Sequence, residues 1–182
     1  MLFRSHLTYF FNGGDDVQQQ SEQHILLTTP KTESAQNQPE SQSFKITDKF
    51  LRSVELGSGG LFIVNLPAAD LVAETGLLDK TVEAIQYVDT CLGGIINKIR
   101  EAGGIALVTS THGNCEEMTN ILTGEPHYLT TSNPVPFHFI SDFANGLKLR
   151  EDGVLADIAP TILGILNIEK PVEMTGSDLR IT

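Results

Sequence analysis

The feature of this sequence that most limits its fold is a long amphipathic helix pattern enclosed by two apolar runs. Between residues 79 and 102, apolar side chains recur at helical spacing, at Val82, Ile85, Val88, Leu92, Ile95, Ile96 and Ile99. An almost uninterrupted apolar run, residues 61–66, precedes this pattern, and a second run, residues 105–109, follows Gly103 and Gly104. Runs of this kind are typical of strands covered on both faces. The order predicts a strand–helix–strand unit with two parallel strands.

Three further segments extend this unit into a larger α/β fold. Residues 46–53 predict a short helix, and residues 136–140 predict a third strand. Residues 155–166 predict a last helix that contains Pro160. Alternation of helices and strands is typical of a layered α/β protein. We therefore predict three layers, with a mostly parallel sheet and helices on both of its faces.

The first part of the chain has a different composition. Residues 7–11 and 25–27 are short strand candidates, because both are rich in β-branched, aromatic or other apolar residues. Residues 28–43 consist largely of Pro, Gln, Ser and Asn, which predicts a long surface loop. We therefore predict one domain overall. Within it, residues 1–45 form strands and a polar loop packed on an α/β core of residues 46–182.

The charge balance excludes some classes of partner. The 182 residues contain 12 Lys and Arg against 23 Asp and Glu, a formal net charge of −11. So acidic a chain repels nucleic-acid phosphates and anionic lipids. No apolar run approaches the ~18–20 residues of a membrane span, and the first residues do not have the pattern of a secretory signal. Two cysteines are too few for a disulfide framework. We predict a protein of the cytoplasm or another reducing compartment.

Polar residues follow both predicted strands of the central unit. Asp70 and Glu74 come after residues 61–66 and are four apart, so a helical turn places them on one face. His112 follows residues 105–109. Ligands of parallel sheets bind beyond the carboxyl ends of strands. Each group also has a structural interpretation, as an exposed carboxylate pair and as a histidine in a tight turn. His127 lies in a later loop and is either a ligand or a solvated side chain.

Six stretches carry motifs that occur together, and in this order, in one enzyme family. They are residues 6–14 (H-L-T-Y-F-F-N-G-G, family H-V-T-F-F-F-N-G-G), 69–76 (A-D-L-V-A-E-T-G, family P-D-M-V-G-H-T-G), 109–118 (T-S-T-H-G-N-C-E-E-M, family T-A-D-H-G-N-A-E-x-M), 131–136 (T-S-N-P-V-P, family T-T-N-P-V-P), 155–159 and 173–177. The chain therefore resembles the C-terminal, phosphatase-domain part of the cofactor-independent (2,3-bisphosphoglycerate-independent) phosphoglycerate mutases, which belong to the alkaline-phosphatase superfamily.

The resemblance implies an alkaline-phosphatase-like fold and a known chemistry. Members of the family interconvert 2-phosphoglycerate and 3-phosphoglycerate in glycolysis. A serine accepts the phosphoryl group and returns it to the other hydroxyl, while two divalent ions, typically manganese, polarise the phosphate. The resemblance further implies that the family's N-terminal strand, which belongs to a segment bearing the serine, and its inserted substrate-binding domain have no counterpart in these 182 residues.

The metal-ligand positions implied by the resemblance are only partly kept. Asp70 and His112 match the family's ligands. Glu74 stands where the family has a histidine, Thr111 where it has an aspartate, and Thr130 where it has a histidine. Hydroxyls are poor replacements for carboxylate and imidazole ligands. We expect at most a vestigial site of Asp70, His112 and Glu74, for manganese or another divalent ion, and no catalytic or substrate-binding residues.

These departures predict a degenerate relative of the mutases that is not catalytic and serves as a structural or interaction subunit. Because the family's N-terminal strand is missing from this sequence, we expect an exposed sheet edge that a protein partner or a second copy covers. The alternative is a residual or split metal-dependent mutase, or a single-metal phosphatase, that requires a partner chain.

Overall fold

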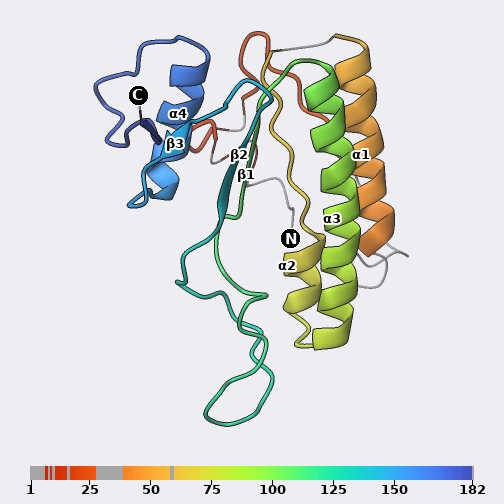
Figure 1. The fold of residues 1–182 in the computed structure, drawn as a ribbon. Helices are drawn as coiled ribbons and strands as arrows, with labels where there is room; N and C mark the ends of the chain where they lie inside the picture. Colours follow the sequence, from red (N-terminus) through yellow and green to blue (C-terminus); the bar gives the residue numbers. More distant parts are fainter. Residues whose placement is uncertain are drawn as a thin grey trace.

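The computed structural model has three layers. It describes residues 7, 9, 11–15, 17–27, 39–57 and 60–181. Its elements are α1 (Pro39–Glu55), α2 (Ala68–Ala73), α3 (Leu78–Glu101), β1 (Ala106–Thr109), β2 (Phe137–Ile140), β3 (Lys148–Leu149), the 3-10 helix η2 (Leu155–Asp157), α4 (Ile158–Ile165) and β4 (Arg180–Ile181). Helices α1 to α3 lie on one side of the β1–β2 pair and α4 lies on the other (Figure 1). The predicted α/β class, with helices on both faces, is confirmed.

Helix α3 confirms the helix predicted from apolar spacing and ends where two glycines follow. Gly103 has a φ of 69°, in the left-handed region that only glycine adopts easily. The amide of Gly104 donates to the carbonyl of Ile99 over 2.8 Å, which satisfies one of the last carbonyls of the helix. The glycine pair therefore ends α3 and turns the chain directly into β1.

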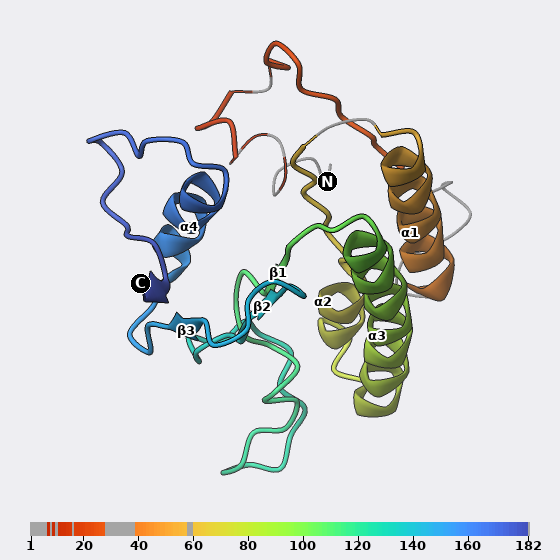
Figure 2. The same cartoon turned by 45° about the horizontal axis from the view of Figure 1, so that its top comes forward.

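Helices α1 and α2 pack against α3. The side chains at this contact are small or apolar and almost fully buried, among them Leu71 and Val72 of α2 and Ala84, Cys91 and Ile95 of α3. Helix α1 lies beside α3 and runs in the same direction (Figures 1 and 2). The rings of Phe50 and Phe62 meet edge to face with centroids 5.5 Å apart. This aromatic contact joins α1 to the extended segment 61–66.

Helix α1 is longer than the helix predicted at residues 46–53. It begins at Pro39, a residue tolerated in the first turn of a helix, where an amide hydrogen has no intrahelical partner. The predicted loop 28–43 is therefore wrong for residues 39–43, and its residues 28–38 lie outside the described residues.

The strand pairs differ from the parallel ladder expected between residues 61–66 and 105–109. β1 pairs antiparallel with β2, from Ala106 opposite Ile140 to Thr109 opposite Phe137, and β3 pairs antiparallel with β4. Segment 61–66 is extended and runs in the same direction as β1 (Figure 1), but it is not assigned as a strand. Its direction fits the predicted unit. The predicted parallel pairing with β1 is wrong, since no backbone hydrogen bond joins residues 61–66 to another described segment.

The described residues of the N-terminal part are not in strands. Leu7, Tyr9 and Phe11 are expected in one strand and residues 25–27 in another, but none of them belongs to a strand of the structure. Residues 25–27 are exposed, and among the described residues no backbone hydrogen bond joins them to another segment. The division at residue 45 stays a prediction. None of the helices in the described ranges is long and apolar enough to cross a membrane.

The buried carboxylate of Asp157 joins the start of η2 to the loop that precedes β4. Asp157 accepts hydrogen bonds from the amides of Ser177 over 2.7 Å and Val154 over 3.0 Å. These bonds, the first above all, lower the pKa of Asp157. Pro160 lies in the first turn of α4, where it interrupts no intrahelical hydrogen bond. The predicted helix 155–166 is therefore confirmed as η2 followed by α4.

Replacing Asp157 with alanine is expected to destabilise the chain by about 1–3 kcal/mol, because two amides of buried or partly buried backbone lose their acceptor. Urea unfolding followed by circular dichroism measures the change. Asp152→Ala is the matched control, since the Asp152 side chain is 79% exposed and only pairs with Arg150. Equal losses in the two variants would contradict the role given to Asp157.

Candidate functional site

The structure brings together two of the three candidate ligands. Asp70 lies in the first turn of α2, directly after the extended segment 61–66 and Pro67. His112 follows β1. The two side chains meet with His112 Nε2 3.1 Å from Asp70 Oδ1. The structure therefore brings the residues that follow the two segments into contact at one place.

Both ring nitrogens of His112 have partners. Nε2 bonds to the Asp70 carboxylate, and Nδ1 lies 2.8 Å from the hydroxyl of Thr111. A carboxylate only accepts, so this network assigns a proton to Nε2 and leaves Nδ1 to accept the Thr111 hydroxyl proton. A metal ion at Nε2 would need the lone pair of that atom, so the hydrogen bond to Asp70 would have to break first. Asp70 and Thr111 therefore occupy both ring nitrogens of His112.

Two further side chains close in on the carboxylate. The side-chain nitrogen Nδ2 of Asn114 donates to Asp70 Oδ1 over 3.3 Å, while Asn114 Oδ1 is buried without a partner in the described part of the chain. The thiol of Cys115 lies 3.8 Å from the carbonyl of Ala69. Burial raises the pKa of Cys115, and the charges of Asp70 and Glu116 raise it further. A thiol held protonated in this way is a poor nucleophile.

A carboxylate that sequence reasoning missed connects the two loops of the site. Glu116 accepts hydrogen bonds from the Asn114 amide over 2.7 Å, from Asn133 Nδ2 over 3.0 Å and from the Thr131 hydroxyl. The amide of Thr131 donates to the carbonyl of Gly113 over 2.7 Å. We call these contacts the Glu116 clamp. The Thr131 hydroxyl, the strongest contributor, helps to lower the pKa of Glu116 to about 2.

The clamp also explains why residue 113 is glycine. A Cβ atom at this position would overlap with the Thr131 hydroxyl and the Glu116 carboxylate. A side chain at residue 113 would therefore displace the Thr131 hydroxyl and the Glu116 carboxylate and so break the clamp. In the stretch 109–118 the glycine that the loop needs is therefore kept, although Thr111 stands where the resemblance implies an aspartate.

The other candidate residues lie apart from the pair. Glu74 is exposed at the C-terminal end of α2, one turn beyond Asp70. His127 bonds through Nδ1 to the carbonyl of Glu117 over 2.8 Å, and its amide bonds to Met118. It therefore stabilises its own loop. Thr130 is exposed next to the clamp residue Thr131.

The donor set does not fit a pair of divalent ions. Among the described residues, no three His, Cys, Asp or Glu side chains gather closely enough to hold a metal ion. Asp70 and His112 offer two donors that already bond to each other, and Thr111 adds only a hydroxyl. Two ions require several carboxylate or imidazole ligands each. The vestigial site of Asp70, Glu74 and His112 stays a prediction.

The sequence and the fold of this chain are similar to those of known proteins. The chain belongs to the metalloenzyme superfamily, whose family profile matches residues 4–170. Within it, the chain is similar to 2,3-bisphosphoglycerate-independent phosphoglycerate mutases. It is 42% identical over 175 residues to that of Clostridium botulinum (strain ATCC 19397 / Type A) and 40% identical over 177 residues to the second such mutase of Methanosarcina barkeri. These alignments cover 96% and 97% of this chain, and 34% and 33% of the relatives.

A solved structure confirms the fold. The chain superposes on the phosphoglycerate mutase of Leishmania mexicana, determined at low cobalt concentration, with a TM-score of 0.84 and 23% identity. The match covers 97% of this chain and 35% of that protein. The predicted alkaline-phosphatase-like fold and the resemblance to part of the mutases are therefore both confirmed. The chain spans about a third of the length of its relatives.

Glu116→Gln is expected to remove a stabilisation that depends on pH. The folded pKa of about 2 lies below the usual value of 4.5, so the ionised clamp stabilises the fold above pH 4.5 and loses this effect as the pH falls towards 2. Urea unfolding between pH 2 and 7 measures it. The difference in the free energy of unfolding between the wild type and the variant should shrink as the pH falls from 4.5 towards 2.

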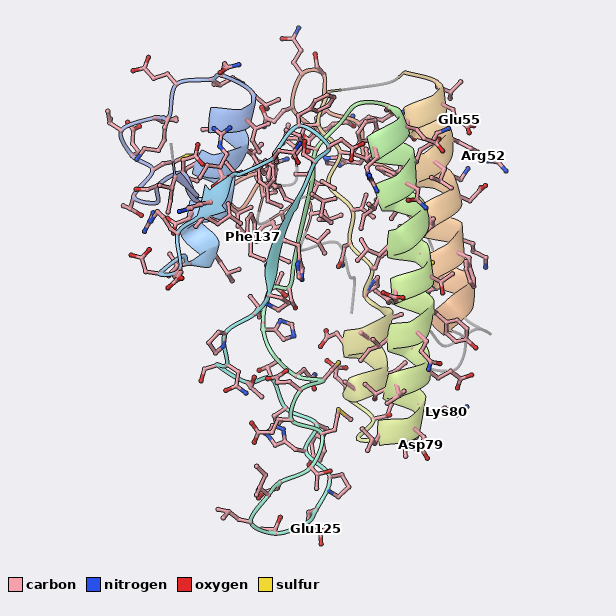
Figure 3. All side chains as sticks on the ribbon, in the orientation of Figure 1. Arg52, Glu55, Asp79, Lys80, Glu125 and Phe137 are labelled. Carbon is pink, nitrogen blue, oxygen red and sulfur yellow. The ribbon has the colours of Figure 1, made fainter. Side chains whose placement is uncertain are left out.

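Glu125→Gln is the matched control for the clamp, because it makes the same change of charge at the tip of the long loop (Figure 3). Glu125 is exposed, and its carboxylate has no recorded hydrogen bond in the described structure. The same pH dependence in both variants would show that general charge effects, and not the clamp, are responsible.

Proposed function

We propose that this chain is a degenerate mutase-like member of the metalloenzyme superfamily that does not catalyse phosphoglycerate interconversion and serves as a structural or interaction subunit. The single observation that carries the proposal is the closed contact between Asp70 and His112. The two retained ligand-type residues satisfy each other, and no third His, Cys, Asp or Glu of the described chain lies close enough to hold a metal ion with them.

The pattern of retained and changed residues supports this proposal. Glycine at position 113 and the Glu116 clamp preserve the shape of both loops. In contrast, Thr111, Thr130 and Glu74 replace residue types that bind hard divalent ions well. A fold that keeps its backbone requirements while losing ionisable ligands is more consistent with selection for shape than for turnover.

A second candidate is a residual or split metal-dependent mutase or phosphatase that is completed by a partner chain. One observation favours it. The buried Asn114 Oδ1 close to Asp70 has no hydrogen-bond partner in the described residues. In that case manganese, or another divalent ion, would be held by Asp70 and His112 together with donors from the partner.

We further propose that the protein acts in the cytoplasm or another reducing compartment. Cys91 is buried and Cys115 is partly buried, and both are free thiols. Free thiols persist where the glutathione and thioredoxin systems keep cysteines reduced.

Manganese titration by calorimetry tests the donor set. The native chain is expected to bind manganese more weakly than the micromolar range, because two mutually bonded donors do not complete a coordination shell. The triple variant Thr111→Asp, Glu74→His, Thr130→His is expected to bind more tightly, since it supplies ligands of the types that the resemblance implies. Adding Asp70→Asn to that variant should abolish the gain.

An assay of 2-phosphoglycerate and 3-phosphoglycerate interconversion separates the two candidates. We expect no turnover by the native chain with manganese present. Stoichiometric tight manganese binding, together with turnover that Asp70→Asn removes, would overturn the non-catalytic proposal in favour of the second candidate.

A further inference from the structure

Two asparagines of this chain, Asn12 and Asn145, are followed directly by glycine. Asparagine is a thermolabile residue, because the backbone nitrogen of the next residue can attack its side-chain carbonyl carbon. Glycine in the next position favours this attack, since it has no Cβ atom to hinder the nitrogen and its backbone rotates freely. In a folded protein, the reaction then depends on what holds the asparagine side chain and the glycine amide.

Asn145 and Gly146 lie in an exposed turn between β2 and β3 (Figure 1). The amide of Leu147 donates to the carbonyl of Ala144 over 3.0 Å, and Gly146 has a φ of 83° while Asn145 has no positive φ. This is the pattern of a type II turn, in which Asn145 and Gly146 are the two central residues. A Cβ atom on Gly146 would meet no other atom within 4 Å. The reacting atoms therefore have free space around them.

No contact in the described structure holds the two reacting groups. Neither the side-chain amide of Asn145 nor the backbone amide of Gly146 has a hydrogen-bond partner among the described residues. Within the described chain, the bond from Leu147 to Ala144 closes the turn. A turn closed by one hydrogen bond and exposed at its centre opens readily by local fluctuation. The Gly146 nitrogen is then able to reach the Cγ atom of Asn145.

The other pair, Asn12 and Gly13, has the same chemistry but a held side chain. Asn12 Nδ2 donates to both carboxylate oxygens of Glu22, over 3.2 Å and 3.1 Å. The backbone amide of Gln19, above all, and the ring of His24 lower the pKa of Glu22, so this carboxylate is ionised near neutral pH. Hydrogen bonds to an ionised acceptor are stronger than neutral ones. Glu22 therefore fixes the Asn12 side chain away from the geometry of the reaction.

We propose that Asn145 is a site of spontaneous modification, at which the side chain cyclises with Gly146 to a succinimide that hydrolyses to aspartate and isoaspartate. We propose also that Glu22 protects Asn12 from the same reaction. Both parts rest on the contrast between a side chain with no partner in the described residues and one held by a carboxylate.

The reaction is balanced by water and ammonia. The Gly146 nitrogen loses its proton to hydroxide and forms a bond to Cγ of Asn145, while the bond from Cγ to Nδ2 breaks and ammonia leaves. Water then opens the ring at one of its two carbonyls. Breaking the new bond to Cγ gives aspartate, and breaking the original peptide bond gives isoaspartate. The chain gains a water and loses an ammonia, with no oxidation or reduction.

The modification changes both the charge and the backbone of the connection from β2 to β3. Either product adds a negative charge to the formal net charge of −11. Isoaspartate also lengthens the main chain by a carbon atom, so the bond between Leu147 and Ala144 no longer closes a type II turn. On either side, Asp142 pairs with Arg100 of α3 over 2.7 Å, and β3 pairs with β4. The change is therefore confined to the turn.

Timed incubation of the full chain at mildly alkaline pH, followed by peptide mapping in a mass spectrometer, tests the proposal. Fragmentation by electron transfer distinguishes aspartate from isoaspartate. In the folded chain, Asn145 is expected to convert to both products about tenfold or more faster than Asn12, because hydrogen bonds to a charged group hold only Asn12. In the chain unfolded in urea, the two sites are expected to react at similar rates.

Two variants separate the parts of the proposal. Asn145→Gln should remove the products at residue 145, because glutamine would have to form a larger ring and does so much more slowly. Glu22→Ala should raise the rate at Asn12 towards that at Asn145 and leave the rate at Asn145 unchanged. Glu125→Ala is the matched control, since its exposed carboxylate has no hydrogen-bond partner among the described residues, and it should change neither rate.

Each part of the proposal has its own contrary result. An unmodified Asn145 in the folded chain would overturn the proposed site. Aspartate without isoaspartate would overturn the succinimide route, since direct hydrolysis of the side chain gives aspartate alone. Equal rates at the two sites in the folded chain, or an unchanged rate at Asn12 in Glu22→Ala, would overturn the protection by Glu22. The test requires neither metal nor substrate, so its result is independent of the proposed function.

Discussion

The close packing of α3 against α1 and α2 is the contact on which the other features depend. Thr81, Ala84 and Cys91 of α3 are almost fully buried and have small side chains, so the helices approach closely. This contact fixes α2 and therefore the position of Asp70 in its first turn. It also fixes α1, whose Phe50 supports the extended segment 61–66 through Phe62. At its other end, α3 leads through the glycine turn into β1.

The candidate site consists of two polar contacts with different meanings. In the pair of Asp70 and His112, residues suited to bind a ligand have become each other's partner. In the Glu116 clamp, an ionised carboxylate organises backbone and hydroxyl donors of two loops and so determines their shape. The first contact lacks the further ligands that the resemblance implies, because Thr111 and Glu74 stand at two of their positions. In the second contact, the Glu116 carboxylate has hydrogen-bond donors from both loops. The loops are therefore well ordered by interactions that involve no ligand.

The sequence predicted the elements whose signals are local. Apolar spacing identified α3, a compact apolar run identified β2, and η2 with α4 followed from a pattern that tolerates Pro160 in the first turn. Asp70 and His112 became candidates because both follow apolar runs, and ligands of parallel sheets bind beyond the carboxyl ends of strands. The Glu116 clamp was missed because its partner Thr131 belongs to a distant loop, and only the folded chain brings the two together. The strands expected at residues 7–11 and 25–27 are not present in their described residues. Local β propensity alone does not make a strand, because a strand also needs a neighbouring segment to pair with.

Segment 61–66, which bonds to no other segment in the described part of the chain, also has a consequence for the solubility of the protein. Edge strands with apolar side chains are sites of aggregation, and proteins often protect them with charge. Here no charged residue lies within the segment itself, so the protection is supplied by the net charge of the whole chain. That charge disappears near the isoelectric point of about 4.7. The net charge that opposes aggregation is therefore lost in mildly acidic solution, at a higher pH than that at which Glu116, with its pKa lowered to about 2, becomes protonated.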